Sequence, residues 1–280
     1  MKCKNIFRIF GNSQASDQRA ARAARRNQKP DGFGMPRCLS SLTATIRSMG
    51  MNIKNSITLP NAPTTARTIP LKSDSHFSGH LVVQTGGSNG TGWEREQVME
   101  VESHLEMNLA LILTMRPQVA ELENQVLFKW WCPHKKALKC HFFDFRVNLA
   151  DGSRVAVMVK DSRKLSCPKF CAEARSIATK VTPAFADDVV VMTEADVDPV
   201  EIHNATFLDS LKETDPEADA AARRAMRGRL GARSISDIVT DVGLPGRGFR
   251  AVGRLLRRGE LALTKIERIT PEALVCRACA

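Results

Sequence analysis

The stretch HFFDFRVNLADGSRVAVMVK, from His141 to Lys160, predicts two β-strands joined by a tight turn. Phenylalanine and valine favour strands, and the sequence Ala-Asp-Gly between them is typical of a turn. Two charged residues do not suit the interior of a sheet, because Asp144 lies among three phenylalanines and Lys160 ends an otherwise apolar strand. This pattern indicates either an ordinary sheet edge or the site of a metal-dependent phosphodiesterase.

The geometry of the turn decides between these interpretations. A two-residue loop would pair Phe145 with Met158 and place Asp144 and Lys160 on opposite faces of the sheet. A three-residue loop with Gly152 as a left-handed bulge would pair Asp144 with Met158 instead. The aspartate and the lysine would then lie on one face, so a shared site requires the bulged turn.

The flanking sequence predicts a mixed α/β sheet flanked by helices. Apolar residues at helical spacing (Val98, Val101, Leu105, Leu109 and Ile112) predict one helix from about Trp93 that Pro117 ends. A strand at 121–131, the two opening strands, a helix at 168–181 and a buried strand at 187–193 follow. Three sequential strands form a meander, and the crossover helix returns the last strand to the same sheet.

The first predicted helix offers a second carboxylate for a metal site. Glu102 and Glu106 are four residues apart and therefore lie on one helical face. Oxygen ligands of this kind suit Mg²⁺, and a nearby lysine could orient water or stabilise charge in the transition state. Each glutamate could equally be an ordinary solvated helix residue, and Glu102 is the reserve candidate to Glu106.

Two segments together, ESHLEMNLALILTMRPQVAELENQ and FFDFRVNLADGSRVAVMVK, resemble TnsA, the endonuclease subunit of heteromeric bacterial transposases. TnsA belongs to the restriction-endonuclease-like nucleases, and the resemblance covers about residues 93–270. It implies that Glu106 and Asp144 bind Mg²⁺ or Mn²⁺, with the carbonyl of Val159 as a further ligand, and that Lys160 is the catalytic lysine. It also implies DNA as substrate and a transposase or AAA+ ATPase subunit as partner.

One position departs from the family pattern. Two residues before the lysine the superfamily has Glu or Asp, and TnsA has Gln, whereas this chain has Met158. A thioether is a poor ligand for Mg²⁺. The alternative prediction is therefore a catalytically inactive nuclease-fold protein that acts as a DNA-binding or regulatory module.

The C-terminal sequence predicts such a module. A helical connector at 198–230 precedes a winged-helix or helix-turn-helix-like domain at 231–280, in which Ser234 or Ser236 caps one helix and Gly243 separates it from the next. The segment ELALTKIERI suggests a β-wing. Between Arg223 and Arg258 the chain has ten arginines and two acidic residues. The predicted DNA contacts are Arg247, Arg250, Arg254, Arg257 and Arg258, although a basic solvated face or a protein-docking module would have the same composition.

Composition and charge set the remaining expectations. The net charge is +11, but residues 1–50 hold ten of the 41 basic residues and only two of the 30 acidic ones, which predicts a basic, disordered extension. Residues 51–92 are predicted to be an extended segment with little regular structure, and residues 93–197 are predicted to form the nuclease-like domain. No apolar run suits a membrane span, and scattered cysteines favour a reducing, cytoplasmic location.

A zinc site is a low-ranking alternative. Cys132, His134, Cys140 and His141 could be drawn as its ligands, but neither half has the usual spacing between sulfurs. The pair Cys276 and Cys279 has no second pair to complete such a site.

Overall fold

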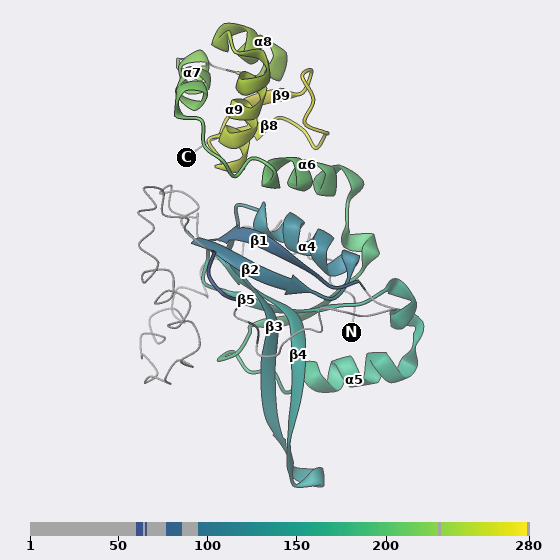
Figure 1. Cartoon of the computed structure of the whole chain (residues 1–280). Helices are drawn as coiled ribbons and strands as arrows, with labels where there is room; N and C mark the ends of the chain where they lie inside the picture. Colours follow the sequence, from purple (N-terminus) through teal and green to yellow (C-terminus); the bar gives the residue numbers. More distant parts are fainter. Residues whose placement is uncertain (1–59, 64, 66–76, 86–94, 229–230, 279–280) are drawn as a thin grey trace, which may run out of the picture. The chain divides into compact units, whose positions relative to one another are not determined.

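A four-stranded mixed sheet forms the centre of the N-terminal part of the protein (Figure 1). The computed structural model describes residues 60–63, 65, 77–85, 95–228 and 231–278, so the predicted basic extension at 1–50 lies outside the described residues. The strands are β3 (Val119–Cys132), β4 (Ala137–Leu149), β5 (Arg154–Val159) and β6 (Asp188–Met192), in that order across the sheet. The first three pair antiparallel and β6 pairs parallel to β5, which confirms the predicted meander and crossover.

Secondary structure covers both faces of this sheet. On one face, α4 (His104–Thr114) and the two-stranded sheet of β1 (Gly79–Thr85) and β2 (Arg95–Val101) share an apolar cluster with β3, β4, β5 and β6. On the other face, α5 (Pro168–Ala178) packs through Ala174 and Ile177 on Phe143 and Met158. The predicted α/β class is therefore confirmed.

The predicted first helix was wrong in its N-terminal half. Residues Arg95–Val101 form β2, which pairs antiparallel with β1, and the helix begins only after Ser103. Gln97, Met99 and Val101 are buried while the residues between them are not, so burial alternates with the period of a strand. Strand β1 also lies within residues 51–92, the segment that was predicted to be extended with little regular structure.

Strands β3 and β4 continue as a two-stranded ribbon beyond the rest of the sheet (Figure 1). The pairing of β4 with β5 ends at Phe145 and Val157, whereas β3 and β4 stay paired as far as Cys132 and Ala137. The short 3₁₀ helix η1 (Pro133–Lys135) closes the ribbon.

Two 3₁₀ helices and α6 complete the part of the chain before the C-terminal helices. The 3₁₀ helices η2 (Ser162–Ser166) and η3 (Glu194–Asp196) follow β5 and β6, and α6 (Pro199–Asp209) comes next. Helix α6 packs on α4 through Ala205, while its Phe207 joins the C-terminal apolar cluster. Helix α6 thus contributes to both clusters.

The C-terminal part combines three helices with a small sheet. Helix α7 (Pro216–Met226) comes first and is followed by the short strand β7 (Arg233–Ser234). Next come helices α8 (Ile235–Val242) and α9 (Pro245–Arg257), and then strands β8 (Leu261–Leu263) and β9 (Leu274–Arg277). The three strands pair in the order β7-β9-β8. The hydroxyl of Ser234 caps α8, and Gly243, with φ of +72°, ends it, so both predicted boundaries are confirmed.

Candidate active site

The bulged turn that a shared site requires is present. Phe145 pairs with Val157 and Val147 pairs with Val155, which is the register of a three-residue loop. Gly152 has φ of +81°, a left-handed conformation that glycine adopts without steric cost, and its N–H donates to the carbonyl of Leu149. The paired part of the two strands, up to Phe145 and Val157, therefore has the register of the bulged turn.

Asp144 and Lys160 are in direct contact. The Nζ atom of Lys160 lies 3.3 Å from Oδ2 of Asp144 and donates to the carbonyl of Val159 at 2.7 Å. The backbone N–H of Val159 donates to the same Oδ2 atom at 2.7 Å. Asp144 is buried, whereas the Lys160 side chain is 37% exposed, so the lysine links a buried carboxylate to the surface.

The local course of β4 explains how a carboxylate reaches the amide of Val159. Extending the register of β4 and β5 by two residues would pair Phe143 with Val159. Instead, the backbone N–H of Val159 donates its hydrogen bond to the Asp144 side chain. Phe145 packs in the cluster under α4, whereas Phe143 packs in the cluster under α5, so the strand changes face at Asp144. Gln125 lies at the matching position of β3 and has φ of +49°, which is rare for a residue other than glycine. Asp144 thus occupies a distortion that both strands share.

Glu106 approaches from the first turn of α4 and is buried. Ser103, the N-cap, accepts a hydrogen bond from the Glu106 N–H and donates to Oε1 of Glu106 at 3.0 Å, while the Glu102 N–H donates to Oε2 at 2.9 Å. Burial raises the pKa of Glu106, and the negative charge of Asp144 raises this pKa further. The second effect indicates that the two carboxylates lie near each other. Glu102, the reserve candidate, contributes its backbone N–H to this arrangement.

These groups form a compatible but sparse set of ligands for a hard cation. Asp144 accepts no hydrogen bond at Oδ1 from the described residues, and each Glu106 oxygen accepts only one from them. The carbonyl of Val159 is a third oxygen, although Lys160 already donates to it. Mg²⁺ keeps several waters when one or two carboxylates bind it, so two carboxylates and a carbonyl fit its requirements. Within the described ranges, no group of three or more His, Cys, Asp and Glu residues is placed to hold a metal ion.

Met158 does not face this site. Its side chain is buried in the cluster under α5, beside Phe143 and Ala174. Met158, where the sequence departs from the TnsA pattern, therefore belongs to the core.

The sequence did not single out His141 or Glu173 for this neighbourhood. Burial lowers the pKa of His141; the negative charges of Asp144 and Glu173 act to raise it, and the positive charge of Lys160 acts to lower it. The Nε2 atom of His141 is buried without a hydrogen-bond partner among the described residues. The histidine ring packs edge-on against Phe143, with ring centroids 4.8 Å apart. No spacing rule connects a residue of β4 with Glu173 of α5, so only the fold reveals this proximity.

The structure contradicts the zinc alternative. Cys140 pairs with Lys129 on β3, three residues along that strand from Cys132, which is a separation of about 10 Å. His141 lies near Asp144, whereas His134 belongs to η1 at the far end of the ribbon. The four proposed ligands do not converge. Cys279 lies outside the described residues.

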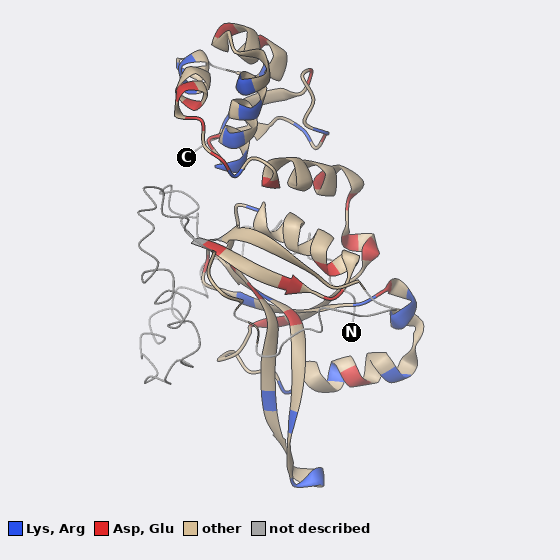
Figure 2. Ribbon diagram, viewed as in Figure 1, with Lys and Arg blue, Asp and Glu red and all other residues tan. Residues whose placement is uncertain are grey.

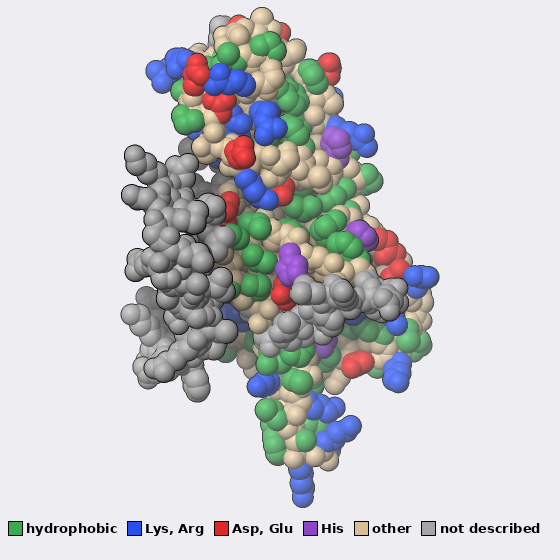
Figure 3. All heavy atoms as spheres, viewed as in Figure 1, with side chains coloured by type: hydrophobic (Ala, Val, Ile, Leu, Met, Phe, Trp, Pro, Cys, Tyr) green, Lys and Arg blue, Asp and Glu red, His purple; other side chains and the backbone are tan. Residues whose placement is uncertain are grey.

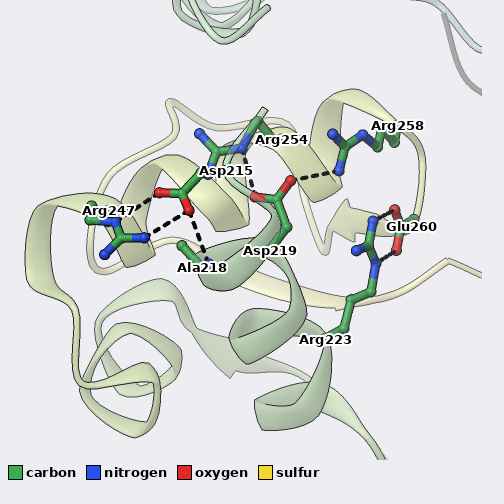
Figure 4. A network of polar contacts seen from close by, with 8 residues as sticks. All are labelled: Asp215, Ala218, Asp219, Arg223, Arg247, Arg254, Arg258 and Glu260. Atoms are coloured by element: carbon green, nitrogen blue, oxygen red, sulfur yellow. Dashed lines mark hydrogen bonds and ion pairs between the residues drawn. The ribbon is translucent and has the colours of Figure 1, made fainter. Parts of the chain in front are cut away.

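The arginines of α9 and its C-cap make a network of ion pairs with acidic residues of α7 and its N-cap (Figure 4). Arg254 donates through Nε to Asp219 at 2.7 Å, and Arg258 donates to the other oxygen of Asp219 at 2.9 Å. Arg247 forms a two-bond contact with Asp215 and a further bond with Glu217. Hydrogen bonds from Arg247 hold the pKa of Asp215 well below its usual range.

This network corrects the predicted set of DNA-contacting arginines. Arg254 and Arg257 are buried, so neither is placed to reach a phosphate. Arg258 is partly buried against Asp219. Arg250 is exposed, and the Arg247 side chain is 49% exposed, but its hydrogen bonds go to Asp215 and Glu217. Much of the positive charge in α9 therefore stabilises the C-terminal part itself.

Comparison with known proteins adds no family. No protein-family model matches the chain, and no curated protein is significantly similar to it. In the part of the chain that the structure describes, no helix is both long and apolar enough to cross a membrane.

Proposed function

We propose that the protein is a metal-dependent DNA endonuclease of the TnsA-like, restriction-endonuclease-like type. The observation that carries the proposal is the contact of Lys160 with Asp144 at 3.3 Å beside the carbonyl of Val159. The contact depends on the bulged turn at Gly152 and on the distortion of β4 at Asp144. An ordinary strand at the edge of a sheet requires neither feature. The mixed sheet between α4 and α5 is compatible with this fold.

The roles of the residues follow from their chemistry. Glu106 and Asp144 would hold Mg²⁺ or Mn²⁺, with the Val159 carbonyl as a further ligand. The ion, when bound, would polarise the phosphate and lower the pKa of an attacking water. The ammonium group of Lys160 would orient that water or offset negative charge as it develops on the phosphate oxygens. The hydrogen bonds from Ser103 and Glu102 would hold the Glu106 carboxylate in one orientation.

The C-terminal part would dock DNA or a partner subunit. Its order of one helix, a short strand, two helices and two strands agrees with that of a winged helix. In the proposed setting, cutting at the ends of a mobile element, this part would contact DNA, a transposase or an AAA+ ATPase. Arg250 is the best-placed of the predicted arginines for such a contact.

One observation favours the alternative function. Met158 is buried in the core, so the protein ligand that the superfamily carries at this position is missing. A protein with this fold and no activity would act through DNA binding alone.

A plasmid-nicking assay with Mg²⁺ or Mn²⁺ distinguishes the two functions. The wild-type protein should convert supercoiled plasmid to the nicked form, and chelation of the metal or Asp144→Ala should stop it. Equal nicking by wild type and Asp144→Ala, or none by either, would exclude the enzymatic function.

A further inference from the structure

The end of the β3–β4 ribbon exposes two large apolar side chains. Trp131 and Leu138 are 59% and 62% exposed, and among the large hydrophobic residues that the structure describes only Ile266 is more exposed. The two are direct partners across the ribbon, so they lie side by side on one face. We call residues 129–140 the ribbon tip.

The ribbon tip is also strongly basic. It carries Lys129, Lys135, Lys136 and Lys139, and the sequence has no acidic residue between Glu123 and Asp144. None of the four lysines makes an ion pair with the residues that the structure describes. Figure 2 shows basic residues on both strands and at the end of the ribbon, and Figure 3 shows basic and hydrophobic side chains together there.

The exposed side chains of the ribbon tip do not pack on the apolar core. The neighbouring Trp130 stacks on Phe128, with ring centroids 5.5 Å apart, and packs against the cluster under α5. Trp131 points to the opposite face of the ribbon, because successive residues of a strand alternate. The inner half of the ribbon is therefore anchored by Trp130, while Trp131 and three of the four lysines (Lys129, Lys135 and Lys136) are exposed.

We propose that the ribbon tip binds duplex DNA beside the phosphodiester that reaches Asp144. A two-stranded β-ribbon fits the major groove, lysines bind the phosphates on either side, and exposed apolar groups contact the base edges. The combination of positive charge with an exposed aromatic group matches DNA better than an acidic or purely apolar protein partner. This proposal rests on the proposed nuclease function for the identity of the DNA.

The ribbon also fixes where on the DNA the contact falls. Leu138 is six residues before Asp144 on β4, and a strand rises about 3.3 Å per residue, so the two lie roughly 20 Å apart. One base pair spans about 3.4 Å of duplex, which corresponds to about six base pairs. The ribbon tip would contact the DNA about half a helical turn from the phosphodiester that is cut.

The test measures binding of a fluorescently labelled, mixed-sequence duplex of about three helical turns by anisotropy, in EDTA and over a range of salt concentrations. Trp131→Ala should weaken binding about 5-fold or more, because the exposed apolar surface of the indole would be removed from water against the groove. Lys129→Gln with Lys135→Gln should lower the slope of log affinity against log salt by about 2. Lys169→Gln with Lys180→Gln removes the same charge from two exposed positions, one at the start of α5 and one just after its end, and should leave both quantities near those of the wild type.

The outcomes separate this proposal from the proposed function. Ribbon-tip variants that bind the duplex like the wild type, with unchanged circular dichroism, would overturn the ribbon proposal even if Asp144→Ala abolishes nicking. Weaker binding by these variants would support the ribbon even if no variant or wild type nicks plasmid. If the variants lose binding only to vesicles of anionic lipid and not to DNA, the ribbon tip is a membrane contact and the proposal is wrong.

Discussion

Removal of the Asp219 carboxylate should destabilise the C-terminal part more than any other single charge deletion in Figure 4. The side chains of Asp219 and Arg254 are 3% and 4% exposed, and their Nε–Oδ1 distance is 2.7 Å. In Asp219→Ala, Arg254 would lose its one hydrogen-bond partner among the described residues and remain as a buried, uncompensated charge. Such a loss costs about 3–5 kcal/mol of unfolding free energy.

Removal of the Arg254 charge should lower the free energy of unfolding by less than removal of the Asp219 carboxylate. In Arg254→Met the carboxylate of Asp219 keeps Arg258, whose Nη1 lies 2.9 Å from Oδ2, and the methionine fills much of the vacated space. The expected loss is that of one charge-assisted hydrogen bond, about 1.5–3 kcal/mol. The asymmetry follows from the geometry, because Asp219 has two arginine partners and Arg254 has one carboxylate partner.

Urea denaturation followed by two signals measures both effects. All three tryptophans of the chain precede residue 132, so their fluorescence reports on the N-terminal part, whereas circular dichroism also reports on α7, α8 and α9. Asp219→Ala should shift the circular-dichroism transition and leave the fluorescence transition nearly unchanged. An equal or smaller shift for Asp219→Ala than for Arg254→Met would refute the assignment of Asp219 as the shared partner.

Three further predictions concern local structure and pH. Gly152→Ala should cost about 1–2 kcal/mol by denaturation, because φ is +81° and no neighbouring atom would touch the added methyl group; Gly246→Ala, in the first turn of α9, should be neutral or stabilising. Ser103→Ala should cost about 1 kcal/mol by the same assay through loss of the α4 N-cap, and a Thr replacement should restore most of it. The depressed pKa of Asp215 means that its contact with Arg247 stabilises the fold above about pH 4 and is lost as the pH falls below that value. Wild type should therefore lose urea resistance on acidification more steeply than Asp215→Asn, and parallel pH profiles would contradict this.

The sequence predicted the sheet well because its signals are local. The Ala-Asp-Gly turn admits few loop lengths, and glycine at the bulge position selects the observed register of β4 and β5. The first helix was mispredicted because Val98 and Val101 suit a helical face and also occur in a strand. Only the pairing of β2 with β1 decides between them.

Contacts between distant segments could not be predicted in this way. Arg254 and Arg258 looked like DNA ligands because their acidic partner, Asp219, lies 35 and 39 residues away in α7. The distortion at Gln125 and Asp144 leaves no mark in composition, so the burial of Met158 on the far side of the sheet was also hidden. The same applies to His141, whose electrostatic partners come from β4, from the residue after β5, and from α5.

The most direct test of the central claim is the Mg²⁺-dependent rate at which Asp144→Asn nicks plasmid DNA, compared with wild type. The amide can still accept the hydrogen bond from Val159, so the fold should be kept while the metal-binding charge is removed. The proposed function predicts metal-dependent nicking by wild type and a rate at least about a hundred-fold lower for a folded Asp144→Asn. Nicking by Asp144→Asn at the wild-type rate, or no nicking by the wild type with either metal, would contradict it.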